Sequence, residues 1–210
     1  MIQLQYSARV EVEKCTGCKQ CERICPSGAI AMIDKKAAID DDRCIDCQRC
    51  IDRCNRENAI TRVLRPEAVI RVVDHGDLDQ EEIQRLCNKA GVHPDLPICG
   101  CNAILGKEAA AAVLKGAKTP EDFCAMTGAR AGCGIYCMTR IFQYLKGAGI
   151  DLDEPKDRRW INLTLSLIEL PEDIIAKVDT AYPYHYLAED WNQQVRRKSV
   201  SPKKKEGADV

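Results

Sequence analysis

The feature that most constrains this sequence is a run of four cysteines that occurs twice near the N-terminus. The first run precedes Pro26 and contains Cys15, Cys18, Cys21 and Cys25. The second precedes Asn55 and contains Cys44, Cys47, Cys50 and Cys54. A short alternating segment comes before each run, at residues 8–12 and 37–42, and an Ala-Ile step follows each run. This repeat predicts a duplicated unit of strand, cysteine loop, short helix and return strand.

Runs of this kind suit a cubane iron–sulfur cluster, which needs four thiolates around a compact core. Three cysteines spaced by two residues can wrap three corners of the cluster, and the fourth ligand has to come from elsewhere in the chain. Zinc is the alternative, because it also binds four thiolates. However, zinc sites commonly use two C-x2-C pairs and leave no role for a third and fourth cysteine in each run.

On these motifs, residues 1–64 resemble the bacterial-type two-[4Fe–4S] ferredoxins, in which the fourth cysteine of each run serves the other cluster. The resemblance implies one ligand set made of Cys15, Cys18, Cys21 and Cys54. It implies a second set made of Cys44, Cys47, Cys50 and Cys25. The second run departs from the family pattern at Asn55 and carries one more residue before its Ala-Ile step. Because neither run lacks a ligand, both clusters are expected to be coordinatively closed, which favours electron transfer over Lewis-acid catalysis.

The cysteine content is the unusual part of the composition, with 14 cysteines among 210 residues. A disulfide scaffold would require export, and the first ten residues do not read as a signal peptide. No stretch approaches the length of a membrane span. A net charge of −1 gives no global field that would attract nucleic acid. These observations predict a cytoplasmic protein whose clustered thiols bind metal or do redox chemistry.

A further set of cysteines predicts a third centre, with one pair at Cys99 and Cys101 and another at Cys133 and Cys137. Four cysteines in two close pairs are enough for a [2Fe–2S] rhomb, and the last pair flanks the start of a helix expected at residues 136–146. Helices are also expected at 80–89, at 107–114 and after Thr119-Pro120. Zinc is the alternative at this site, with a reactive dithiol as a further one.

The spacing of these cysteines, together with the segments 116–122 and 127–133, resembles the bacterioferritin-associated ferredoxin type of [2Fe–2S] domain. The resemblance covers residues 97–150, and it implies that Cys99, Cys101, Cys133 and Cys137 are the cluster ligands. The remaining cysteines, Cys87 and Cys124, are expected to be small core residues. The three histidines are isolated in the sequence and are expected to be structural: His75, His93 and His185.

No motif indicates an active site. The sequence has no G-x-G-x-x-G fingerprint, and Gly100 to Lys107 is one residue too long for a phosphate-binding P-loop, with Glu108 where serine or threonine is needed. The apolar segment 160–170 and the aromatic group Tyr182, Tyr184, Tyr186 and Trp191 are expected either to bind a partner or to pack over the rest of the chain. The basic segment 196–205 is expected to be disordered.

The sequence thus predicts an α+β protein. Its parts are a ferredoxin-like dicluster domain at 1–64, a connector with one helix at 65–96, a small all-helical [2Fe–2S] domain at 97–150 and an extended C-terminal arm at 151–210. It is expected to carry two [4Fe–4S] clusters and one [2Fe–2S] cluster and to have no catalytic activity of its own.

The function hypothesis is an electron-transfer subunit of a cytoplasmic oxidoreductase complex, a hetero-oligomer in which a flavoprotein or ferredoxin donates electrons and a catalytic subunit accepts them. The alternatives are a free-standing ferredoxin-type carrier and an iron–sulfur scaffold or delivery protein, which cluster transfer to an apo-protein would support. A redox-sensing regulator with a DNA-binding tail is a further alternative, and a gel shift would test it.

Overall fold

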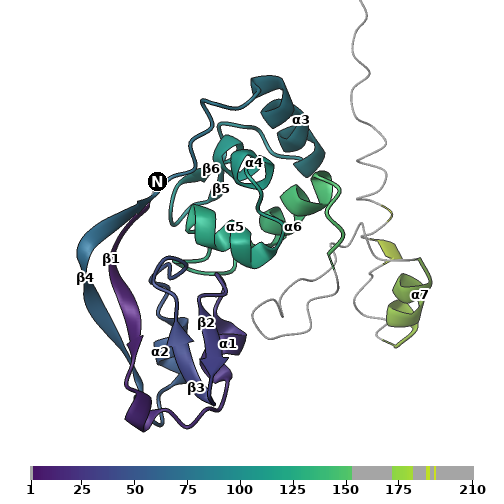
Figure 1. The fold of residues 1–210 in the computed structure, drawn as a ribbon. Helices are drawn as coiled ribbons and strands as arrows, with labels where there is room; N and C mark the ends of the chain where they lie inside the picture. The colour runs from purple at the N-terminus through teal and green to yellow at the C-terminus, as the bar shows by residue number, and fades with distance from the viewer. Residues whose placement is uncertain (1, 153–171, 182–187, 190–191, 193–210) are drawn as a thin grey trace, which may run out of the picture. The chain divides into compact units, whose positions relative to one another are not determined.

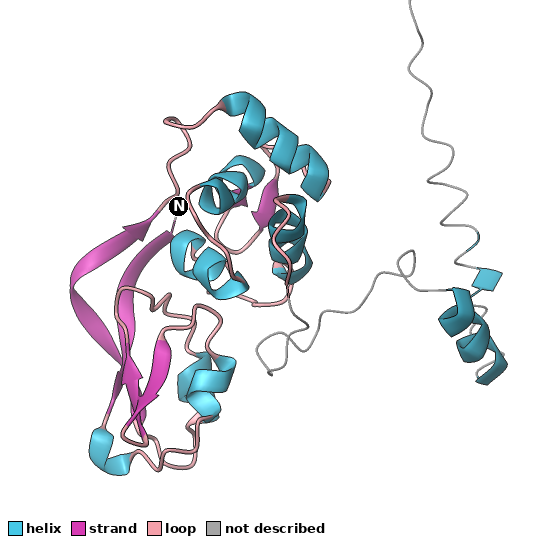
Figure 2. Ribbon diagram, turned by 45° about the vertical axis from the view of Figure 1, so that its right-hand side comes forward, coloured by secondary structure: helices cyan, strands magenta, loops and turns pink. Residues whose placement is uncertain are grey.

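The structure is a computed structural model, and it describes residues 2–152, 172–181, 188–189 and 192. The chain divides into two compact units, Met1–Asn162 and Leu163–Val210. All three predicted cysteine groups lie in the first unit. Figure 1 shows its elements in chain order, and Figure 2 separates its helices from its strands.

The N-terminal part of the first unit is built from four strands and two short helices. Its strands are β1 (Ile2–Val10), β2 (Ile30–Ile33), β3 (Lys36–Ile39) and β4 (Ile60–Arg71). Its helices are α1 (Gln20–Ile24) and α2 (Arg49–Arg53), preceded by a 3-10 turn, η1 (Val12–Lys14). The order strand, helix, strand therefore occurs twice, as the repeat predicts.

The strands pair across the duplication. β1 runs antiparallel to β4, with Val10 opposite Ile60, and β2 runs antiparallel to β3, with Ile30 opposite Ile39. Asp34 and Lys35 both have positive φ in the two-residue turn between β2 and β3, as tight hairpins require. Ala8, Ile30 and Ile60 are buried and pack with the cysteines of both loops. The strands thus bring the two cysteine loops to one small core.

Four helices follow. They are α3 (Gln80–Ala90), α4 (Gly106–Leu114), α5 (Pro120–Thr127) and α6 (Met138–Gly147). Asp79 caps α3 and Thr119 caps α5, whose first residue is Pro120, and Gly91 ends α3 in the left-handed conformation. Buried alanines of α4 and the buried Tyr144 of α6 form the centre of this helical group.

The structure agrees with the prediction of a mixed α and β chain and corrects three details. The segment 97–150 is not all helical, because β5 (Pro97–Cys99) and β6 (Ile104–Leu105) form a hairpin around the first two cysteines of the third group. The predicted boundary at 64 falls inside β4, because that strand continues to Arg71 while paired with β1. Finally, the predicted extended arm contains helix α7 (Glu172–Ala181).

Two other expectations for the arm, the apolar segment 160–170 and the basic segment 196–205, lie outside the described residues. So do the four aromatic residues of 182–191. In the part of the chain that is described, no helix is both long and apolar enough to cross a membrane.

Candidate metal centres

The two cysteine loops have the same backbone conformation at corresponding positions. Gly17 and Asp46, each just before the second cysteine of its run, have φ values of 73° and 52°. The residue after that cysteine is also left-handed in both loops, with φ of 61° at Lys19 and 60° at Gln48. Short helices then start at the next residue, carry the third cysteine of each run and end with the fourth cysteine as C-cap. The left-handed residues thus occur at matching positions of the two loops.

The first cysteine group consists of Cys15, Cys18, Cys21 and Cys54. These four residues line one cavity of about 460 Å³, together with Met32, Ala37 and Ile60. Cys18 is exposed, Cys15 and Cys54 are half-buried, and only Cys21 is buried. The main-chain N–H of Ala37 donates to the Cys15 sulfur at 3.5 Å. Cys54 therefore reaches the cavity of the first loop although it belongs to the second run.

The second cysteine group consists of Cys25, Cys44, Cys47 and Cys50. These residues line a tighter cavity of about 20 Å³, and all except the half-buried Cys47 are buried. The Cys25 sulfur accepts a hydrogen bond from the Ala29 N–H at 3.2 Å and lies 3.6 Å from the Ser27 hydroxyl. The donor set, four thiols with main-chain and hydroxyl donors, has the chemistry that a [4Fe–4S] cluster requires.

The residue after the fourth cysteine changes the local backbone. Pro26 keeps Cys25 extended, with ψ of 112°, because proline disfavours the helical region for the residue before it. Asn55 imposes no such restriction, and Cys54 has ψ of 22° with its N–H bonded to the carbonyls of Cys50 and Ile51. The departure from the ferredoxin pattern thus lets the chain leave α2 at Cys54 through a hydrogen-bonded turn instead of an extended residue.

The third cysteine group consists of Cys99, Cys101, Cys133 and Cys137, and it has a buried side and an exposed side. Cys99 and Cys137 are buried and share a side-chain hydrogen bond. Cys101 and Cys133 are exposed, and the Cys133 N–H donates to the Cys101 sulfur at 3.4 Å. The nearest thiols therefore pair across the two sequence motifs. Cys137 is the N-cap of α6.

Burial makes three of the thiols in the first two groups less acidic. Burial raises the pKa of Cys21 to about 11 and that of Cys47 to about 11, and it also raises the pKa of Cys50. Because the thiolate is the metal ligand, iron binding at these groups has to release protons.

The third group differs in its acidity. The hydrogen bond from Cys137 lowers the pKa of Cys99 to about 6, with help from the N–H groups of Asn102, Cys101 and Arg130, and it raises the pKa of Cys137. Main-chain N–H groups of Ile135 and Tyr136 lower the pKa of Cys133. The loop is therefore arranged to stabilise negative charge on sulfur.

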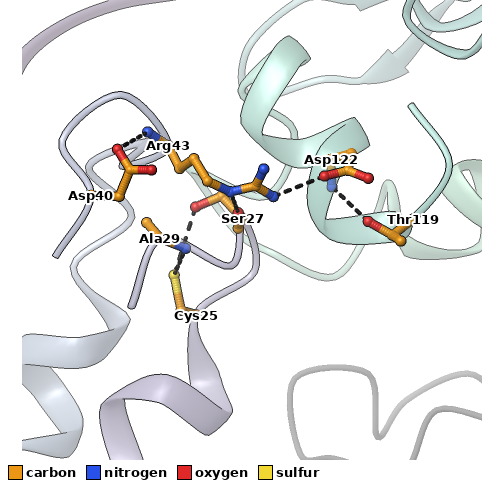
Figure 3. A network of polar contacts seen from close by, with 7 residues as sticks. All are labelled: Cys25, Ser27, Ala29, Asp40, Arg43, Thr119 and Asp122. Atoms are coloured by element: carbon orange, nitrogen blue, oxygen red, sulfur yellow. Dashed lines mark hydrogen bonds and ion pairs between the residues drawn. The ribbon is translucent and has the colours of Figure 1, made fainter. Parts of the chain in front are cut away.

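An ion-pair network joins the loop that precedes the second cysteine run to helix α5 (Figure 3). The Arg43 guanidinium donates to the Asp122 carboxylate at 3.0 Å and, through Nε, to the Ser27 carbonyl at 3.0 Å. The Arg43 N–H donates to the Asp40 carboxylate. The Asp122 N–H donates to the Thr119 hydroxyl at 3.1 Å, which fixes Asp122 at the start of α5. The second group is thereby held beside the helical part of the unit.

Two arginines near the cysteines have no assigned role in the sequence interpretation. Arg49 opens α2 between Cys47 and Cys50, and Arg130 is buried in the loop between α5 and α6. Arg49 occupies the position in the second run that Gln20 occupies in the first. This difference between the repeats is the only feature of the sequence that could have pointed to Arg49.

The remaining cysteines and histidines are expected to be structural, and the described ones have the following surroundings. Cys87 and Cys124 are fully buried, and the Tyr144 hydroxyl bonds to the Cys87 sulfur at 3.5 Å. The His93 Nδ1 accepts the Asp95 N–H at 3.2 Å, and His75 is half-buried beside α3. His185 lies outside the described residues.

Within the described ranges, no three His, Cys, Asp or Glu side chains converge as closely as one metal ion would require. The ligands of an iron–sulfur cluster surround several iron atoms and inorganic sulfides, so they lie farther apart than the ligands of a single zinc ion.

Comparison with known families agrees with this division into centres. A model described as a 4Fe-4S dicluster domain matches residues 14–58, and one described as a BFD-like [2Fe-2S] binding domain matches residues 97–147. The searches of curated proteins and of solved structures gave no match. The chain thus combines a 4Fe–4S dicluster domain with a bacterioferritin-associated-ferredoxin-like [2Fe–2S] domain, and it is an iron–sulfur protein of the electron-carrier type.

Proposed function

We propose that this chain is the electron-transfer subunit of a cytoplasmic oxidoreductase complex. In this role it carries single electrons between a donor, a flavoprotein or a ferredoxin, and the catalytic subunit that uses them. When bound, iron–sulfur clusters supply reversible one-electron chemistry. The chain's own residues supply ligands, spacing and an electrostatic environment.

The proposed ligands follow the three cysteine groups. Cys15, Cys18, Cys21 and Cys54 would hold one [4Fe–4S] cluster, and Cys25, Cys44, Cys47 and Cys50 the other. Cys99, Cys101, Cys133 and Cys137 would hold the [2Fe–2S] cluster. The crossed sharing of Cys25 and Cys54 is supported by the cavities, because each of these residues lines the cavity of the opposite loop.

The observation that carries the proposal is the intermediate position of the second group. Its Cys50 belongs to the same buried cluster as Cys21 of the first group. Its Cys47 lies within electrostatic range of Arg130, whose main-chain N–H bonds to Cys99 in the third group. A series of three centres, with exposed thiols at Cys18 on one end and at Cys101 and Cys133 on the other, suits a protein that accepts an electron at one surface and delivers it at another.

The alternatives make different use of the same residues. A free-standing carrier would need only one surface for both partners. A scaffold or delivery protein would need a cluster that leaves readily, and the exposed pair Cys101 and Cys133 is the part of the chain where release would start.

The test is purification of the native complex under anaerobic conditions with a tag on this chain. Co-purification of stoichiometric flavin and catalytic subunits is the expected result. Recovery of the chain alone, still holding all three reducible centres, would overturn the subunit proposal and leave the free carrier. Transfer of the [2Fe–2S] cluster to an apo-protein faster than electron transfer would instead support delivery.

A further inference from the structure

Two arginine side chains lie between the second and third cysteine groups. Arg49 comes from the dicluster part of the chain and Arg130 from the [2Fe–2S] part. The Arg130 residue is only 4% exposed, which is unusual for arginine, since the desolvation of a guanidinium is costly unless nearby negative charge compensates it. Their positions make them candidates for a role in electron transfer between the two groups.

Arg130 contacts the third group through both its main chain and its side chain. Its main-chain N–H is directed to the sulfurs of Cys99 and Cys137. Its Nε donates to the carbonyl of Gly134, at 3.0 Å, inside the loop that carries Cys133 and Cys137. The residue has φ of 67°, a strained conformation for a side chain other than glycine, and such strain is retained where the surroundings demand it.

Arg49 reaches the same loop from the other side. Its guanidinium lies against the Cα of the buried Gly134, so closely that a Cβ at this position would collide with it. The Arg49 Nε is buried and has no hydrogen-bond partner within the described residues. Its main-chain N–H bonds to the sulfur of Cys47, which belongs to the second group. One arginine thus contacts ligand residues of the second group and a loop of the third.

The charges also lie close together. Burial lowers the pKa of the Arg130 guanidinium, and the neighbouring Arg49 lowers it further, whereas negative charge at Cys124, Cys137 or Cys47 would raise it. The buried cation of Arg130 and the half-buried cation of Arg49 fit an environment that becomes strongly negative. Thiolates that hold two clusters create that environment, and each electron that arrives adds one negative charge.

We propose that Arg49 and Arg130 are positioning residues that hold the second and third centres together and stabilise the reduced state of both. The inference rests on the proposed function, because it assumes clusters at these two cysteine groups. With clusters bound at the two groups, an electron lost by one centre would be gained by the other. The positive charges of Arg49 and Arg130 would then offset the added negative charge at whichever centre is reduced.

The experiment is a redox titration of the full chain, followed by EPR, for the unaltered protein and the variants Arg49→Gln and Arg130→Gly. Arg49→Gln installs the residue of the first run. Arg130→Gly removes the guanidinium while favouring the left-handed backbone. Removing one charge at short range in a protein of effective dielectric about 20 is expected to change the ratio of reduced to oxidised [2Fe–2S] centre about tenfold at a fixed potential. This corresponds to a downward shift of about 59 mV for one electron.

The matched control is Arg23→Gln, which removes the same charge from an exposed position on α1. It is expected to leave the [2Fe–2S] potential unchanged. Arg130→Lys is expected to recover most of the potential lost in Arg130→Gly, since it keeps the charge. An unchanged [2Fe–2S] potential in both arginine variants would overturn the proposal. So would an equal shift in Arg23→Gln.

A further variant tests the contact between Arg49 and Gly134 without removing a charge. Gly134→Ala displaces the Arg49 guanidinium, and it is expected to shift the potential in the same direction as Arg49→Gln. The retained charge in Arg130→Lys separates this effect from the strain of a side chain at the φ of 71° of Gly134. Iron and sulfide contents of the unaltered chain separate the two levels of inference. If three reducible centres are present and no variant shifts a potential, only the role of the arginines fails. If the centres themselves are missing, the proposed function fails.

Discussion

The first and second cysteine groups share a sequence pattern and a loop conformation, yet their surroundings differ. Both loops turn through left-handed residues before a short helix. The first group nevertheless lines an open cavity of about 460 Å³ and exposes Cys18. The second has three buried thiols and the Ser27 hydroxyl beside Cys25, and it lies next to the helical part of the unit.

This comparison teaches that ligand spacing and redox environment are separate properties. The spacing is local and was copied by duplication. The environment depends on which segments pack around each loop, and cluster potentials vary with hydrogen bonds and burial. The solvent-facing first group suits exchange with a partner protein, whereas the second group suits transfer within the chain. Four pairs of substitutions would break or sharpen the comparison.

The largest effect is expected from removal of the fourth cysteine of each run. Cys54→Ala should remove or disable the first centre and Cys25→Ala the second, so that iron falls from about ten to about six atoms per chain when a [4Fe–4S] cluster is lost. Iron and sulfide analysis measures the loss. Only Cys25→Ala should alter the EPR signal of the neighbouring [2Fe–2S] centre. If Cys54→Ala instead removed the second centre and Cys25→Ala the first, each run would serve its own cluster.

The next effect concerns the left-handed position before the second cysteine. Gly17→Ala should lower stability by about 1–3 kcal/mol, because its Cβ would meet the Lys35 carbonyl at a φ of 73°. Asp46→Ala at the matching position should cost less, because Asp46 already carries a Cβ at its φ of 52° and loses only its ion pair with the exposed Arg62. The apparent melting temperature of the anaerobic protein compares the two variants. A smaller loss for Gly17→Ala would contradict the steric argument.

A smaller effect is expected from exchanging the residues that follow the runs. Asn55→Pro should push Cys54 from its ψ of 22° toward an extended conformation. Its sulfur would then be displaced from the first cavity, and chelators should remove iron from the first centre several times faster. The reverse exchange, Pro26→Asn, should affect only the second centre. Equal rates of iron loss in Asn55→Pro and the unaltered chain would show that the backbone at Cys54 is unimportant.

The smallest effect is expected at Ser27, whose hydroxyl lies 3.6 Å from the Cys25 sulfur. A hydroxyl that donates to a ligand sulfur stabilises the reduced, more negative centre. Ser27→Ala should therefore lower the potential of the second centre, by less than the roughly 59 mV of a tenfold change. Thr16→Ala, at an exposed residue of the first run, serves as the control in the same titration. A rise in the potential of the second centre would contradict the assignment of the Ser27 hydroxyl as donor to the Cys25 sulfur.

Much of the local structure follows from the sequence because it depends on near neighbours. Thr119 and Pro120 start a helix and Gly91 ends one, as the capping pattern predicts. The repeated cysteine spacing predicts two loops of equal conformation, and Lys19 (φ 61°, ψ 6°) and Gln48 (φ 60°, ψ 0°) have closely similar dihedral angles. The β5–β6 hairpin was missed, since strands of two and three residues carry too little alternation to be distinguished from a loop.

By itself, the sequence determined the number of thiols, their grouping into loops and the kind of metal chemistry they suit, because these depend on residue identity and short spacing. The family resemblance already implied that Cys54 joins the first set, and the structure places it at that cavity. Only the tertiary structure decided that the second group lies beside the helical part of the unit and that Arg49 meets Gly134. Those contacts join residues far apart in the chain, where burial and packing select the partner and local propensity has no influence.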